Sequence, residues 1–124
     1  MTTISRYHGT ISATIASSAS LSGAVEISTA PILALYIPSG WTTAAMTFQG
    51  SVDGGTTYAS VFDDSGVEVQ IASTSINTAA AQVIVNASVL EKLAGLQFIK
   101  IRSGTSGSPV TQTAAITIVI GVKG

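Results

Sequence analysis

The stretch FQGSVDGGTTYASVF, residues 48–62, contains the pattern that decides the fold of this chain. Apolar and polar residues alternate on both sides of an acidic, glycine-rich centre, Asp53-Gly54-Gly55. Alternation with a period of two is typical of β-strands, and Asp-Gly readily supplies the positive φ angles of a turn between two strands. The stretch therefore predicts two strands and the bend that joins them, although its acidic centre also raises the question of a ligand loop.

The same alternation recurs along the chain, with turn residues between the runs. It predicts nine strands, at residues 11–16, 24–28, 32–37, 44–52, 57–62, 67–71, 82–85, 96–102 and 115–122. The run ILALYI (32–37) is apolar on both faces, which predicts a central place in a sheet. In the last strand, Ile116, Ile118 and Ile120 share one face, and we expect that face to point into the core. The fold class predicted is all-β, an antiparallel β-sandwich or jelly roll of about eight or nine strands.

One short helix is predicted at residues 89–94. Ser88 and Glu91 have the spacing of a capping box at its start, and Gly95 can take the left-handed conformation that ends a helix. The helix is expected to connect two strands.

A chain of 124 residues is long enough for one domain with a core and too short for two ordinary ones. Residues 21–124 are expected to form the sandwich. Residues 1–20 are rich in Ser, Thr and Ala and contain few apolar anchors. They are expected to form an extended N-terminal arm that orders against a neighbour, with a frayed end as the alternative.

The composition is unusual for a globular domain. Hydrophobic residues make up 46% of the chain and charged residues only 9%, against about 25% charged residues in an average soluble domain. No uncharged stretch offers about 20 consecutive apolar residues, so no membrane-spanning helix is predicted. With a net charge of −1, copies of the chain repel one another little, which favours an assembly. A monomer that hydroxyl side chains keep in solution is the alternative.

The residue types argue against most catalytic sites. The chain has no Cys, which excludes a thiolate nucleophile, and its single histidine, His8, lies in the expected arm. Four acidic residues lie close in sequence: Asp53, Asp63, Asp64 and Glu68. They suggest two hypotheses, a calcium-binding site or a carboxylate pair for glycoside hydrolysis. Their spacing matches no EF-hand loop, and turn chemistry explains them more simply. We therefore predict no enzyme and no catalytic, cofactor-binding or metal-binding residue.

Two further features raise binding functions. Lys100 and Arg102 alternate with isoleucines beside Phe98, as on a surface for single-stranded nucleic acid. Binding of nucleic acid depends mainly on electrostatic attraction to the phosphates. With five basic residues and a negative net charge the chain offers little such attraction, so no nucleic-acid partner is expected. Trp41, the single tryptophan, follows Pro38-Ser39-Gly40 at a strand edge. It is a candidate contact for a partner or a glycan if exposed, or it covers the open end of the sandwich if buried.

Three segments resemble a known group of proteins: IPSGWTTAAMTFQGSVDGGTTYASVFDDSGVEVQI (37–71), LEKLAGLQFIKIRSGTSGSPVTQTA (90–114) and the apolar final strand. The resemblance is to small virion proteins, structural or uncharacterised, of tailed bacteriophages and prophages, with the motifs IP-x-GW, TFQ-x-S-x-DG, KIRSGTS and PV-x-Q. A second likeness is to discoidin-like jelly rolls, through Ser51, Asp53, Gly54 and Tyr58 and then Lys100, Ile101 and Arg102. Neither resemblance transfers a catalytic residue.

The phage resemblance implies a bacteriophage virion structural protein. It would decorate or cement the capsid, or form the base of a head spike or fibre, in a virion assembled in the host cytoplasm. Its expected partners are the major capsid protein, other virion proteins and copies of itself, and a trimer would suit a local three-fold position of a capsid. The alternative is a carbohydrate-binding jelly-roll module that uses Trp41 together with Tyr7 or Tyr58.

Overall fold

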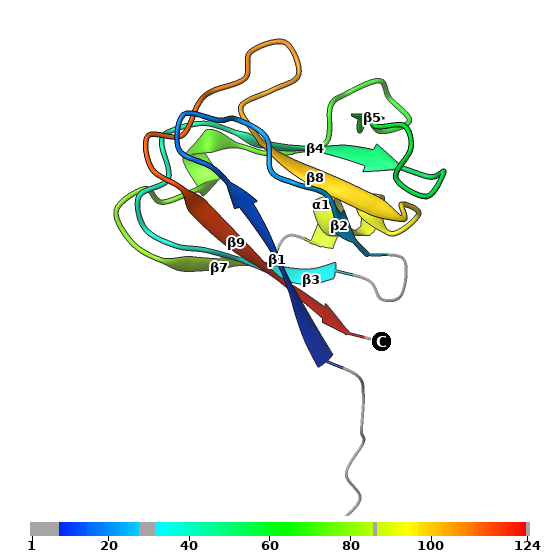
Figure 1. The fold of residues 1–124 in the computed structure, drawn as a ribbon, viewed down its shortest axis with the longest axis horizontal. Coiled ribbons are helices and arrows are strands. Elements are labelled where there is room, and N and C mark those ends of the chain that lie inside the picture. Colours follow the sequence, from blue (N-terminus) through cyan, green and yellow to red (C-terminus); the bar gives the residue numbers. More distant parts are fainter. Residues whose placement is uncertain (1–7, 28–31, 86, 124) are drawn as a thin grey trace, which may run out of the picture.

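The computed structural model of the protein describes residues 8–27, 32–85 and 87–123 and consists of two antiparallel β-sheets packed face to face (Figure 1). In chain order the described strands are β1 (His8–Ile15), β2 (Val25–Glu26), β3 (Ile32–Ile37), β4 (Met46–Ser51), β5 (Ala59–Ser60), β6 (Gln70–Ile71), β7 (Gln82–Ile84), β8 (Phe98–Ser103) and β9 (Ile116–Lys123). Sheet A has the order β1-β9-β3-β7, and sheet B has the order β2-β8-β4-β5 with β6 also paired to β4. The predicted fold class and the predicted nine strands are confirmed.

The chain passes repeatedly between the two sheets. β1, β3, β7 and β9 lie in sheet A, and the strands between them in sequence lie in sheet B. This wrapping is that of a jelly roll, in which most pairs join strands that are distant in sequence. β9 pairs with β1 over all eight residues of each strand.

The core lies between the sheets and is built from β-branched and aromatic residues. Ile116, Ile118 and Ile120 of β9 are all buried, as their alternation predicts. β3 lies between β9 and β7, which confirms its central position, although the outward side chain of Tyr36 is 41% exposed. On sheet B, Phe48 faces Ile101 across β4 and β8, and both are fully buried.

The segment from β4 to β6 differs from the expected arrangement of three strands in a row. β5 and β6 pair with the same edge of β4, at Gln49–Gly50 and at Met46–Thr47 respectively. Between them residues 61–69 leave the sheet as a hairpin, held by the hydrogen bond from the Val69 amide to the Val61 carbonyl at 2.9 Å. Because this hairpin pairs with itself, β5 and β6 are shorter than the strands predicted at 57–62 and 67–71.

The expected N-terminal arm is wrong for residues 8–20. β1 is a full member of sheet A, and its inward side chains Ala13 and Ile15 are buried. Residues 18 and 19 exchange backbone hydrogen bonds with Gln112. The apolar residues are sparse in this stretch because an edge strand needs only every second side chain for the core. Residues 1–7 lie outside the described residues.

The predicted helix is present but begins earlier and ends differently. It consists of α1 (Ala87–Leu90) and a 3-10 turn (η2, Glu91–Leu93), with a second 3-10 turn (η1) at Ser73–Ser75. Ser88 lies inside α1 rather than before its first residue, and Gly95 is not among the residues with positive φ. The helix connects β7 to β8 as predicted, and its Leu90 and Leu93 are buried in the core.

Candidate functional site

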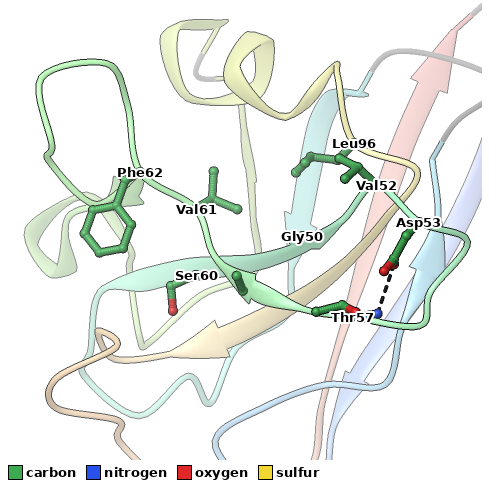
Figure 2. Close-up of a pocket in the computed structure, with 9 residues that line it drawn as sticks. Gly50, Val52, Asp53, Thr57, Ser60, Val61, Phe62 and Leu96 are labelled. Carbon is green, nitrogen blue, oxygen red and sulfur yellow. Dashed lines mark hydrogen bonds between the residues drawn. The ribbon is translucent and has the colours of Figure 1, made fainter.

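A groove of about 470 Å³ lies beside the acidic turn that follows β4 (Figure 2). Its apolar lining comes from residues that are far apart in sequence, Val52, Val61, Phe62 and Leu96. Val52 and Phe62 are 72% and 52% exposed, so the apolar surface is open to solvent. Asp53, Thr57 and Ser60 supply the polar part of the lining.

The acidic turn is held by its own side chains. The Asp53 carboxylate accepts hydrogen bonds through Oδ1 from the Ser51 hydroxyl at 2.8 Å and from the Thr57 amide at 2.9 Å. Gly54 and Gly55 both have positive φ, as the sequence predicts for this turn. The Gly54 amide donates to Oε1 of Gln97 at 2.7 Å, which ties the turn to the segment before β8. The turn interpretation of Asp53 is therefore confirmed.

The hydrogen bonds from Thr57 and Ser51 lower the pKa of Asp53 from 3.8 to about 2. The group is thus ionised near neutral pH and carries no proton for general acid catalysis. Among the described residues that line this groove, Asp53 is the only acidic one, whereas glycoside hydrolysis uses a pair of carboxyl groups. The groove can accommodate an apolar side chain of a partner.

The titration of Asp53 gives a first testable prediction. We expect an NMR titration to find its pKa near 2, and Ser51→Ala to raise that pKa towards 3.8 because one donor is lost. Since the folded pKa lies below the unfolded value, the stabilisation by this group is present above about pH 4 and is lost as the pH falls through 2. An unchanged pKa in Ser51→Ala would contradict the assigned cause.

The other acidic residues do not join Asp53 in a common site. Asp63 accepts the amides of Ser65 and Val67 at 2.9 and 3.0 Å within its own turn and pairs with Lys92 at 3.6 Å. The amides of Val67 and Ser65 lower the pKa of Asp63, with a smaller contribution from Lys92. Among the described residues, no group of three or more His, Asp or Glu side chains could hold a metal ion.

Glu68 and Arg102 form an ion pair that the sequence did not predict. Nη1 of Arg102 lies 3.1 Å from Oε2 of Glu68, and the two side chains are 8% and 12% exposed. Glu68 also accepts hydrogen bonds from the amide and the hydroxyl of Ser106. The pair thus joins the hairpin at 61–69 to β8 and to the loop that follows it.

The basic residues of β8 have different environments. Phe98, Lys100 and Arg102 share a strand face as predicted, but Arg102 is buried. Nζ of Lys100 lies 4.3 Å from the centre of the Tyr58 ring, an intramolecular cation–π contact. One face of Tyr58 is therefore already occupied by a residue of the same chain.

Trp41 is buried, which corrects its assignment as a glycan or partner contact. Its side chain is 2% exposed, and its indole N–H donates to the Ala44 carbonyl at 3.1 Å. The ring belongs to the core cluster between the sheets. Of the two interpretations of Trp41, the buried one agrees with the structure. Tyr7 lies outside the described residues, and so does the side chain of His8.

The two sheets differ in the number of charged side chains that they carry, and the sequence analysis did not predict this difference. Every charged side chain that the structure describes lies on sheet B or in its connections: Glu26, Asp53, Asp63, Asp64, Glu68, Glu91, Lys92, Lys100 and Arg102. The described outer face of sheet A carries hydroxyl and apolar side chains instead, with Tyr36 and Val83 41% and 60% exposed. Charge counts per strand in the sequence would have signalled this difference.

The fold and these sites define an all-β sandwich protein in which the described side chains on the outer face of sheet A are uncharged. No protein-family model matches the chain, and no curated protein matches it. The crystal structure of the SPBc2 prophage-derived protein YomS is similar, with a TM-score of 0.53 and 15% sequence identity over 99% of this chain and 100% of that chain. At this identity the likeness shows a shared fold. Among the described residues, no helix has the length and apolar character needed to cross a membrane.

Proposed function

We propose that this chain is a structural protein of a tailed-bacteriophage virion, either a capsid decoration or cement protein or the base of a head spike or fibre. It binds the major capsid protein or another virion protein and works as a homo-oligomer. By bridging neighbouring shell subunits it adds contacts that must break before the shell opens, and so stabilises the assembled shell by mass action.

The observation that carries this proposal is the likeness to a prophage-derived protein over 99% of the chain. A match that covers both chains from end to end indicates that the sandwich as a whole, rather than one motif, is shared. The phage-type motifs lie at places that organise the fold. TFQGSVDG spans β4 and its turn, and KIRSGTS spans β8 and the following loop.

The chemistry of the sites also supports a binding role. The groove beside Asp53 offers apolar surface and one carboxylate that its own turn already uses. The outer face of sheet A offers uncharged surface that another protein can cover without desolvating a described charge. Both surfaces suit protein partners. If these partners are virion proteins, the chain becomes part of the virion during its assembly in the host cytoplasm.

Purified phage particles provide the test of this function. We expect mass spectrometry of intact virions to detect the chain in stoichiometric copies, and cryo-electron microscopy to locate the sandwich on the head. Particles made without the chain should lose their contents at a lower temperature than complete particles. Absence of the chain from purified virions would refute the proposal.

The carbohydrate-binding alternative is less well supported. Its proposed anchor, Trp41, is buried, and the Tyr58 ring is in contact with Lys100. An exposed aromatic ring is the usual platform for a sugar. Of the aromatic side chains described, Phe62 and Tyr36 are the more exposed ones. Phe62 lines the groove with Asp53, whose carboxylate is already bound by its own turn.

A further inference from the structure

We propose that two copies of this chain join through the free edge of β1, so that the two A sheets become one continuous antiparallel sheet. The inference rests on the proposed function in one respect, since it assigns a surface to the homo-oligomer, and it can fail while the virion role stands.

β1 is the long unprotected edge of the described sandwich. The other edge strands are β7 with three residues and β2, β5 and β6 with two residues each, whereas β1 has eight. Within the described residues, β9 supplies all the backbone partners of β1, so its other edge presents free N–H and C=O groups. A long open edge is a template for another strand.

The residues of β1 lack the devices that keep edges apart. Residues 9–15, GTISATI, contain no charge and no proline, and the pairing of β1 with β9 has no register shift. Natural sheets commonly block an edge with lysine, proline or a bulge. Residues 9–15 contain none of the three. We therefore infer that another β-strand pairs with this edge.

The occupant that best fits this edge is a second copy of β1. A two-fold axis at one residue of β1 places that residue opposite its own copy and pairs residues that lie equally far on either side of it. Like charges near the axis would then lie close together, which is unfavourable for a charged strand and does not arise in this one. With the axis at Ser12, Thr10 lies opposite Thr14 of the partner and Ile11 opposite Ala13. Hydroxyls then meet hydroxyls on the outer face and apolar side chains meet on the inner face, where Ile11 is only partly buried in the single chain.

The pairing of β1 with β9 already shows how such a contact works. The Thr14 and Thr117 hydroxyls are hydrogen-bonded across the two strands at 2.9 Å on the outer face. Thr10 and Thr14 can make the same kind of contact across the two-fold axis. Seven paired residues per strand give about seven interchain backbone hydrogen bonds, close to the roughly ten of an average interface.

Single cysteine variants test the geometry directly, because the chain has no cysteine of its own. Sedimentation should first show a mass of twice 12.5 kDa for the unmodified chain. Under mild oxidation, Ser12→Cys should then form a disulfide-linked dimer, since opposite residues of an antiparallel pair have Cα atoms about 5 Å apart, within disulfide range. The matched control is Val83→Cys, which is exposed on the same sheet face at the opposite edge.

We expect Ser12→Cys to cross-link at least about tenfold faster than Val83→Cys, because pairing raises the effective concentration of its thiol. A monomer in sedimentation would overturn the inference, and so would a trimer. Equal rates for the two variants would overturn it too, because they would indicate that the copies meet through the sheet face. Detection of the chain in virions bears on the proposed function alone, so the two can fail separately.

Discussion

Arg102→Ala is expected to lower the free energy of unfolding by about 3 kcal/mol, near the lower end of what breaking a buried ion pair costs. The guanidinium reaches Glu68 at 3.1 Å, Ser60 at 3.1 Å and Thr47 at 3.4 Å. Its removal leaves the Glu68 carboxylate almost buried with no cation beside it. The loss stays near the lower end because Glu68 keeps its hydrogen bonds from Ser106. Urea denaturation followed by the fluorescence of Trp41 measures the change.

Two further variants separate the ion pair from other effects of Arg102. Lys100→Ala removes a cation from the same face of β8 and should cost about 1 kcal/mol or less. The double variant Arg102→Met with Glu68→Leu should recover most of the lost stability, because it removes both buried charges together. A single variant Arg102→Ala within 1 kcal/mol of the unmodified chain would show that the pair contributes little.

Gly104→Ala is expected to be destabilising by about 2–5 kcal/mol, the sum of a left-handed backbone penalty and overpacking. Gly104 has a φ of +90°, and an added Cβ would lie 2.4 Å from the Ser108 carbonyl oxygen and 2.6 Å from the Val110 nitrogen. These are backbone atoms that cannot rotate away. The glycine also connects β4 to β8, since its amide donates to Ala45 and its carbonyl accepts the Thr47 hydroxyl, both at 2.7 Å.

The matched control is Gly107→Ala in the same loop. An added Cβ at Gly107 meets nothing within 4 Å, and Gly107 is not among the glycines with positive φ. Its stability should change by less than about 1 kcal/mol. Similar midpoints of thermal unfolding for the two variants would contradict the close packing of the loop over Gly104.

The sequence predicted the strands well because alternation is a local property. The period-two runs located all nine strands, and the positive φ of Gly54, Gly55 and Gly66 follows from the residue types of the turns. The capping of the helix was predicted less well. Ser88 and Gly95 have suitable types and spacing, but the helix starts at Ala87, two residues before the predicted start, and its Leu90 and Leu93 are buried.

The candidate sites depended on contacts between distant residues, and the sequence predicted them poorly. Glu68 and Arg102 are 34 residues apart, and the groove combines Leu96 with Phe62. Trp41 could be read as exposed or buried, because its position after a turn does not tell whether the chain folds back over it. Whether a side chain is buried depends on how the two sheets pack, so a local sequence pattern does not predict it.

By itself, the sequence of this protein determined where strands and turns form, because side-chain alternation and glycine conformations act over a few residues. It also determined the small number of charges available to any site. Only the tertiary structure decided that the strand at 8–15 pairs with β9 as an edge of sheet A, that Arg102 is buried against Glu68, and that the described charges gather on sheet B. Those features depend on which strands become neighbours in a jelly-roll wrapping, where most pairs are remote in sequence.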